Sequence, residues 1–283
     1  MSTINQIKRL SYSSLKLLNE NPSDWYKQYI LKQRIDEYKD YFVVGKAFHL
    51  IVEQYNKKWI VNSEIGVKHI EESCKKYNHK EPIDGELKQS ACLVDNYFYD
   101  EPIRAEEAEL EIGMTMSWFP FIAILDAVYT NDWVIEDYKA VSKFTDISDK
   151  NWFEKMSEYY HQAGYYMIAF KEKYGTYPKY VQFTEVKKSV SNLMYSTKDN
   201  IIALCKDFQP EDSKLTKEKI IEKYNPRPIG KNIIKVHYNS ELIDIVTKKI
   251  DIAIYNINLL DKDNLLCPFG KDTAIQDLIL NNK

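Results

Sequence analysis

The sequence feature that most constrains the fold is a pair of apolar, strand-forming runs joined by a short turn. The runs cover residues 121–129 and 133–138, and the triplet Thr130-Asn131-Asp132 between them is rich in turn-forming residues. This pattern predicts an antiparallel β-hairpin. We expect the rest of the chain to be organised around it.

Three polar side chains converge on this predicted hairpin. Successive side chains of a strand alternate between its two faces, so Asp137 and Lys139 share one face while Glu136 and Tyr138 share the other. Asp126 lies on the partner strand. The sequence therefore predicts two carboxylates and an ammonium group close together on one face of a sheet.

Two carboxylates that lie a few ångströms apart repel each other and raise each other's pKa. A hard divalent cation between them relieves the repulsion. Such a cation supplies a Lewis acid and lowers the pKa of a bound water, and a neighbouring lysine can orient that water or offset charge on an oxyanion. The alternative is that Asp126 and Asp137 face solvent and Lys139 is their ion-pair partner. For the Asp-x-Lys pattern alone, the ion pair is the default interpretation.

Length and composition restrict the class of protein. A chain of 283 residues with 44% hydrophobic residues can build one large core, and it contains no internal repeat or linker-like break. We predict a single domain with a helical part over 1–104, a core over 105–190 and a lysine-rich extension over 191–283. The formal net charge of −3 means that nucleic acid binding would need a local basic patch.

Several cofactors and compartments are disfavoured. The four cysteines are scattered without a Cys-x-x-Cys pair, which predicts a reduced cytoplasmic setting and neither a zinc site nor a disulfide framework. The N-terminus lacks an apolar signal core, and no apolar run approaches the ~20 residues that span a bilayer. The Gly-Lys pairs lack the flanking residues of a phosphate-binding loop, and Gly-x-Gly-x-x-Gly does not occur, so we expect no ATP- or NAD-driven chemistry.

Two predicted helices carry polar residues at four-residue spacing, which places them on one helical face. One is an apolar helix bearing His49 and Glu53, and the other is a long helix over about 150–174 bearing Gln162 and Tyr166. Taken alone, His49 is more often a hydrogen-bonded core residue than a metal ligand. A lone Gln-x-x-x-Tyr pair usually has no functional meaning.

Further candidates lie on either side of these segments. A strand over 106–118 places Glu109 and Glu111 on one face, and another strand is expected over 179–187. The residues from 214 to 249 carry a net charge of +5. The default interpretation there is a solvated helical surface.

The alternative is a surface that contacts phosphates. Its candidate DNA-binding residues are Arg227, Lys231 and Lys235. The first two lie in 225–231, which is predicted to be a loop by its proline and glycine content.

In this order, the features resemble the PD-(D/E)xK nuclease superfamily, in its RecB-type and phage recombination-exonuclease branch. The likeness covers about residues 11–190. The motifs that carry it are Ser-x-Ser-Ser-Leu…Asn-Pro…Trp-Tyr at 11–26, Gly45-x-x-x-His49, Asp126, Asp137-Tyr138-Lys139 and Gln162-x-x-x-Tyr166. The resemblance implies an α/β fold with a restriction-endonuclease-like core, in which helices flank a mixed central sheet. Its strands are expected near 107–116, 121–129, 133–139 and 179–187.

The resemblance also implies roles for the residues that match the motifs. His49, Asp126 and Asp137 would bind one or two Mg²⁺ or Mn²⁺ ions, and the Tyr138 carbonyl would complete the shell. Lys139 would position the attacking water.

Other residues would support this centre. Gln162 and Tyr166 would hold the lysine or the DNA strand. An upstream family acid would correspond to Glu109, with Glu111 an equally good candidate, and Glu53 is a further supporting residue.

The chain departs from the family pattern at two places. Ala123 stands where the family often has glycine, which narrows backbone access but removes no ligand. Iron–sulfur members have a cysteine before the first proline and a C-terminal cysteine cluster, whereas here Asn21 precedes Pro22 and only Cys205 and Cys267 follow the core. We therefore expect no iron–sulfur cluster.

The implied reaction is metal-dependent hydrolysis of a DNA phosphodiester by in-line attack of water, leaving a 5′-phosphate and a 3′-hydroxyl. An exonuclease acting on single- or double-stranded DNA ends in recombination, repair or phage DNA processing is the first expectation. The alternatives are a structure-specific or nicking endonuclease and a DNA-binding module without catalysis. The likeness also suggests a recombination or single-strand-binding protein as partner, and a phage origin within a bacterial host.

Overall fold

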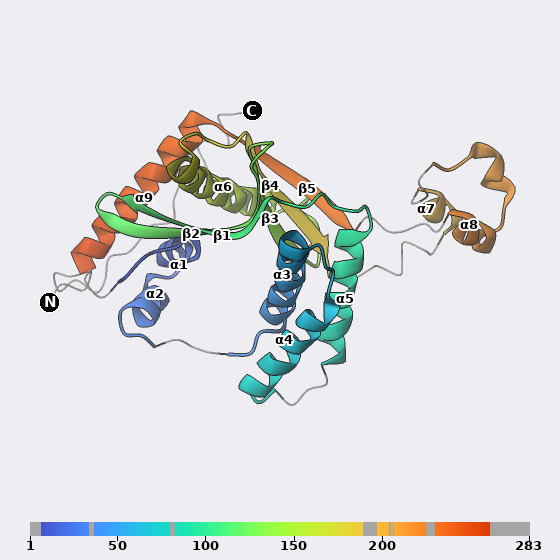
Figure 1. Ribbon diagram of the computed structural model, residues 1–283, viewed down its shortest axis with the longest axis horizontal. Helices are drawn as coiled ribbons and strands as arrows, with labels where there is room; N and C mark the ends of the chain where they lie inside the picture. Colours follow the sequence, from blue (N-terminus) through green and yellow to red (C-terminus); the bar gives the residue numbers. More distant parts are fainter. Residues whose placement is uncertain are drawn as a thin grey trace.

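A mixed sheet of five strands forms the centre of the molecule, in the order β1-β2-β3-β4-β5 (Figure 1). Neighbouring strands are antiparallel except for the parallel pair β3 and β4. The strands are β1 Glu107–Met116, β2 Phe119–Tyr129, β3 Val134–Val141, β4 Tyr180–Lys187 and β5 Lys231–His237. The structure is a computed structural model that describes residues 7–33, 37–79, 83–188, 197–203, 205, 207–224 and 230–260.

The first four strands lie where the sequence predicts them, and the mixed sheet flanked by helices confirms the α/β prediction. The prediction of a helical surface is wrong for 231–237, which form β5. Ile234 and Val236 of this strand join the core, while the side chains of Lys235 and His237 are exposed. Lysines on an edge strand discourage pairing with another sheet, so their presence is compatible with strand structure.

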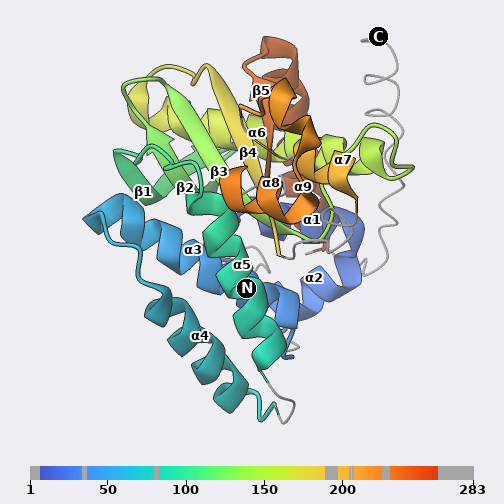
Figure 2. The same ribbon diagram turned by 90° about the vertical axis from the view of Figure 1, so that its right-hand side faces the viewer.

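Helices cover both faces of the sheet. Figures 1 and 2 show α3, α4 and α5 on one side and α6 and α9 on the other. The helices are α1 Tyr12–Glu20, α2 Pro22–Tyr29, α3 Asp40–Lys58, α4 Ser63–Lys76, α5 Asp84–Phe98, α6 Trp152–Tyr174, α7 Lys198–Ala203, α8 Lys217–Tyr224 and α9 Ser240–Leu260. No helix in the described part of the chain is long and apolar enough to cross a membrane.

The caps of the N-terminal helices follow from the sequence. The Ser11 hydroxyl accepts a hydrogen bond from the backbone N–H of Ser14 at 3.3 Å and begins α1. Asn21 ends α1, and its side chain accepts a hydrogen bond from the N–H of Asp24 at 3.1 Å to begin α2. Leu10, just before α1, forms a parallel bridge with Phe121 of β2, which fixes the N-terminal helices against the sheet.

Two hydrophobic clusters place the helices that carry the candidate site residues. On one face, α6 contributes Met167 and Phe170 to a core with Ile135 of β3. On the other face, Phe48 of α3 packs in a cluster with Tyr138 of β3. Residues 135 and 138 therefore point to opposite sides of β3, and α3 and α6 approach the same strand from opposite faces.

Candidate active site

Asp126 lies where β2 stops pairing with β3. The two strands share three residue pairs, of which Ala127 and Glu136 form the last, whereas β3 continues beside β4 as far as Val141. Further along, the same edge of β2 is bridged by Leu10. Between these contacts, no strand of the described chain covers this edge of β2. Asp126 lies in this unpaired stretch of β2, and we refer to the uncovered edge there as the opening beside β2.

The β1–β2 ladder is distorted at the same level. Glu109 has a φ of 50°, in the left-handed region that non-glycine residues rarely adopt. The pair Leu110 and Leu125 belongs to the core under α6, whereas Ala127 belongs to the cluster under α3. Leu125 and Ala127 are two residues apart on β2, yet they pack on opposite sides of the sheet. The alternation of side chains along β2 is therefore interrupted next to Asp126. A residue held in the left-handed region costs about 1–3 kcal/mol, and such strain is common at functional sites.

The Asp126 carboxylate makes contacts with two different elements. Its Oδ2 accepts a hydrogen bond from the backbone N–H of Tyr138 at 2.9 Å and lies 3.4 Å from Nδ1 of His49. The other ring nitrogen of His49, Nε2, lies 3.0 Å from the Tyr138 carbonyl oxygen. The imidazole from α3 and the carboxylate from β2 therefore both contact the backbone of the Asp-Tyr-Lys strand.

Asp137 and Lys139 point towards α6, where Gln162 links them. The Lys139 ammonium lies 2.6 Å from Asp137 Oδ2 and donates a hydrogen bond to Gln162 Oε1 at 3.0 Å. Gln162 Nε2 donates to Asp137 Oδ1 at 3.0 Å and to the Tyr166 hydroxyl at 2.7 Å. Tyr166 in turn donates to Asp137 Oδ1 at 3.0 Å. The Gln-x-x-x-Tyr pair therefore fixes the position of both residues of the Asp-x-Lys motif.

Burial and neighbouring charges shift the pKa values in different directions. Burial disfavours the charged imidazole, but the Asp126 carboxylate outweighs it and raises the pKa of His49. Burial likewise opposes ionisation of Asp126, yet His49 and the Tyr138 N–H outweigh it and lower the pKa of Asp126. Burial raises the pKa of Asp137 by more than Lys139 lowers it, and Asp126 adds to the rise. Burial would lower the pKa of Lys139, but Asp137 and Asp126 raise it overall.

The residues at this site fit a divalent cation. His49, Glu109 and Asp126 each offer a ligand atom, and these atoms lie within 4.8 Å of one another. Asp137 Oδ2 is buried and has the Lys139 ammonium nearby, but no well-directed hydrogen bond within the described chain. Carboxylate oxygens, a backbone carbonyl and an imidazole form a donor set that suits Mg²⁺ or Mn²⁺.

The two acids proposed from β1 occupy different surroundings. Glu109 lies in the potential metal cluster, and burial together with the charge of Asp126 raises its pKa. Glu111 forms an exposed ion pair with Arg9 at 2.9 Å. Glu53 of α3 pairs with Lys57 at 2.7 Å and is not one of the clustered ligands.

The predicted DNA-binding lysines lie away from this cluster, on β5. The Lys231 ammonium pairs with Asp100 and donates to the Tyr97 carbonyl, so its charge is already compensated within the fold. Lys235 lies over the ring of Tyr180, 4.6 Å from its centroid. Arg227 falls outside the described residues. The loop predicted over 225–231 is wrong at Lys231, which begins β5, and residues 225–229 lie outside the described part of the chain.

The structure adds residues that the sequence analysis did not single out. Lys46 lies one helical turn before His49, and its ammonium is 4.0 Å from Glu109. Phe183 of β4 lies beneath Lys139, with 5.7 Å between the ammonium and the ring centroid. Lys46 could have been found from the sequence, because it lies three residues before His49 and therefore on the same helical face. Phe183 had no local signal, since it meets Lys139 across the β3–β4 pair.

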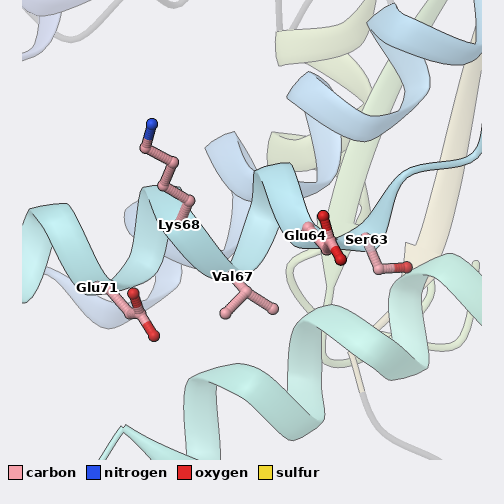
Figure 3. Close-up of a pocket in the computed structure, with 5 residues that line it drawn as sticks. All are labelled: Ser63, Glu64, Val67, Lys68 and Glu71. Carbon is pink, nitrogen blue, oxygen red and sulfur yellow. The ribbon is translucent and has the colours of Figure 1, made fainter.

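A surface pocket on α4 shares no residue with the candidate active site. Figure 3 shows its lining side chains along α4, where acidic, basic and apolar residues alternate without converging on a common point. The residues are Ser63, Glu64, Val67, Lys68 and Glu71. None of them belongs to the polar cluster of β2, β3, α3 and α6.

Two solved structures of other proteins are similar to this chain. A crystal structure of a candidate exonuclease from Eubacterium rectale has a TM-score of 0.58 at 13% identity, covering 98% of this chain and 95% of that one. A phage related exonuclease from Haemophilus somnus has a TM-score of 0.39 at 13% identity, with 89% and 94% of the two chains covered. No curated protein gives a significant match.

The first of these structures shows a shared fold. The profile of one protein family extends over residues 9–239, which include every polar residue of the cluster described above. The chain belongs to the PD-(D/E)XK nuclease superfamily.

Proposed function

We propose that this nuclease is a metal-dependent exonuclease that hydrolyses phosphodiester bonds at the ends of linear DNA. The observation that carries the proposal is that the His49–Asp126 pair and the Asp137–Lys139 pair meet at β3 beside the uncovered edge of β2. They are joined there by the hydrogen bond from the Tyr138 N–H to Asp126. A role in recombination, repair or phage DNA processing, with a recombination or single-strand-binding protein as partner, is part of the same proposal and rests on the family resemblance.

Asp126, Asp137 and the Tyr138 carbonyl would hold Mg²⁺ or Mn²⁺, with His49 and Glu109 as the neighbouring donors. When bound, the ion supplies Lewis acidity to the scissile phosphate and lowers the pKa of a bound water. Asp126 is well suited to this role because its lowered pKa keeps it ionised. A cation beside Asp137 would also offset the effect of burial on that carboxyl.

Lys139 would act as a charged hydrogen-bond donor. Its raised pKa means that it stays protonated, so it orients water or stabilises negative charge on the phosphate and does not serve as a base. Gln162 and Tyr166 are positioning residues, because they contact Asp137 and Lys139 rather than the opening beside β2.

The experiment is digestion of end-labelled linear DNA, single- and double-stranded, beside a covalently closed circle, with Mg²⁺, Mn²⁺ or EDTA. We expect metal-dependent loss of linear DNA and an intact circle. Asp137→Ala and Lys139→Ala should abolish digestion while circular dichroism shows a folded chain. Glu111→Gln is the matched control, since it removes an acid from the exposed side of β1 and should leave digestion unchanged.

Other outcomes assign a different function. Cleavage of the closed circle would replace the exonuclease with an endonuclease. DNA binding without cleavage in either metal would indicate a binding module. Cleavage that survives both Asp137→Ala and Lys139→Ala would reject the site itself.

A further inference from the structure

A lysine- and aromatic-rich surface adjoins the candidate active site where the parallel strands β3 and β4 end. Its members are Tyr41 and Phe42 in the first turn of α3, Phe144 in the loop after β3, and Lys187 and Lys188 at the end of β4. We call these five residues the edge patch. The proposed hydrolysis uses none of them.

The two lysines extend to opposite faces of the sheet. Lys187 Nζ lies 4.5 Å from the ring centroid of Phe144, and Lys188 Nζ lies 5.8 Å from that of Tyr41. Backbone hydrogen bonds fix this edge, because the N–H of Lys188 donates to the Val141 carbonyl at 2.9 Å. Each ammonium is therefore held beside an aromatic ring at the edge of the sheet.

The charges of these lysines are available for a ligand. The lysines on the neighbouring elements form ion pairs, such as Lys155 with Glu185 at 2.8 Å and Lys139 with Asp137 at 2.6 Å. Within the described chain, neither lysine of the edge patch forms an ion pair with a carboxylate. Burial lowers the pKa of Lys188, and the charge of Asp40 only partly opposes this.

The edge patch is close to the catalytic residues along two separate elements. Lys187 pairs with Val141, two residues beyond Lys139, which is about 7 Å along the strand. Tyr41 precedes His49 by eight residues, which is about 12 Å along α3. A nucleic acid strand with a phosphate at the catalytic residues would therefore reach the patch within a few nucleotides.

We propose that the edge patch binds a single-stranded segment of DNA next to the scissile phosphate. The inference rests on the proposed nuclease function and adds a substrate class to it. Tyr41 and Phe42 are 55% and 69% exposed and offer ring faces to unstacked bases, while Lys187 and Lys188 contact phosphates. A duplex keeps its bases stacked inside the helix, so it cannot use the aromatic side chains in this way.

The first test changes the charge of the patch. Binding of fluorescent oligothymidine and of a blunt duplex is measured by anisotropy in EDTA over a range of salt concentrations. In Lys187→Gln/Lys188→Gln, we expect about tenfold weaker binding of the single strand and a salt slope smaller by about 1.4, since each phosphate contact contributes about 0.7. The duplex should bind within about twofold of the unmodified protein.

The matched control is Lys75→Gln/Lys76→Gln at the end of α4, which removes the same charge from two adjacent exposed lysines. It should keep the full salt slope. An unchanged slope in the edge-patch variant, or an equal loss of affinity for the single strand and the duplex, would overturn the inference.

The second test removes the stacking surface. Tyr41→Ala should weaken single-strand binding about tenfold, whereas Tyr255→Ala, which removes an exposed tyrosine from α9, should not change it. Equal affinity in the two variants would contradict base stacking. These binding assays judge the edge patch whether or not DNA is cut. Absence of cleavage by the unmodified protein in Mg²⁺ and Mn²⁺ would instead reject the nuclease proposal.

Discussion

Replacing Lys139 by methionine should destabilise the protein, because it leaves the Asp137 carboxylate buried without its counter-ion. In the structure the Asp137 side chain is 3% exposed and that of Lys139 is 28% exposed, and their charged atoms are 2.6 Å apart. Methionine fills most of the lysine stem, so the change mainly removes the charge. The effect is then electrostatic, with little contribution from a new cavity.

Removing one partner of a buried ion pair costs about 3–5 kcal/mol. Asp137 keeps the hydrogen bonds from Gln162 and Tyr166, so we expect the lower end of this range, about 3 kcal/mol. For a chain of this size, this corresponds to a fall in Tm of roughly 6 °C or more. Urea unfolding and calorimetry in EDTA measure the two quantities without bound metal.

The loss of folding stability in Lys139→Met should depend on pH. The pKa of Asp137 is already raised by burial, and without the lysine it rises further. A carboxyl group whose pKa is higher in the folded state binds protons preferentially there, so stability is greatest below the unfolded pKa and falls as the pH rises towards the folded pKa. The difference between Lys139→Met and the unmodified protein should therefore be small near pH 4, about the unfolded value, and complete at neutral pH.

A double variant separates charge from packing. Lys139→Met/Asp137→Asn removes both charges, so it should regain most of the stability lost in Lys139→Met while remaining unable to cleave DNA. The reasoning is refuted if the double variant is as unstable as Lys139→Met, or if the loss of stability is the same at pH 4 and at neutral pH.

Three further predictions concern the neighbouring residues. Saturating Mn²⁺ should raise the Tm of the unmodified protein, by an amount equivalent to about 2.7 kcal/mol at a hundredfold excess over Kd, and calorimetry should show no such rise for Asp126→Asn. Glu109→Gly should increase the free energy of unfolding by about 1 kcal/mol, because glycine adopts the φ of 50° without strain. The same variant should bind Mn²⁺ more weakly. A variant that unfolds at a lower urea concentration would show that the backbone at Glu109 is not strained. Tyr166→Phe should cost about 1.5 kcal/mol of stability by removing a hydrogen bond to a charged group and lower kcat with little change in KM, and an unchanged kcat would exclude its positioning role.

The strands that carry the site could be predicted because their patterns are local. Alternation places Asp137 and Lys139 on one face whatever the rest of the chain does, and the turn after Tyr129 fixes the partner strand. The spacing of Gln162 and Tyr166 similarly fixes their shared helical face, which the structure brings against Asp137. These features need no knowledge of distant contacts.

The distortion at Glu109 could not be predicted from the sequence. Regular alternation puts Glu109 and Glu111 on the same face, so the two acids were indistinguishable. Glutamate gives no signal for the left-handed conformation that Glu109 adopts in β1. Only this tertiary arrangement brings Glu109 close to His49 and Asp126.

The strand β5 was missed for a different reason. Its lysines raise the local charge and suggest a solvated surface, while its inward residues Ile234 and Val236 are too few to give a strong alternating pattern. The strand forms because β4 offers a free edge, and its seven pairs with β4 run from Val186–Lys231 to Tyr180–His237. Such a partner cannot be identified from a segment of seven residues.

The central claim is that Asp126 and the Asp-Tyr-Lys strand bind a divalent cation. Anomalous diffraction from crystals soaked in Mn²⁺ locates that ion directly. We predict a peak in contact with the Asp126 carboxylate, the Asp137 carboxylate and the Tyr138 carbonyl, which is lost in Asp126→Asn. A protein that cleaves DNA in Mn²⁺ but has its manganese peak elsewhere, or keeps the peak in Asp126→Asn, would contradict the account.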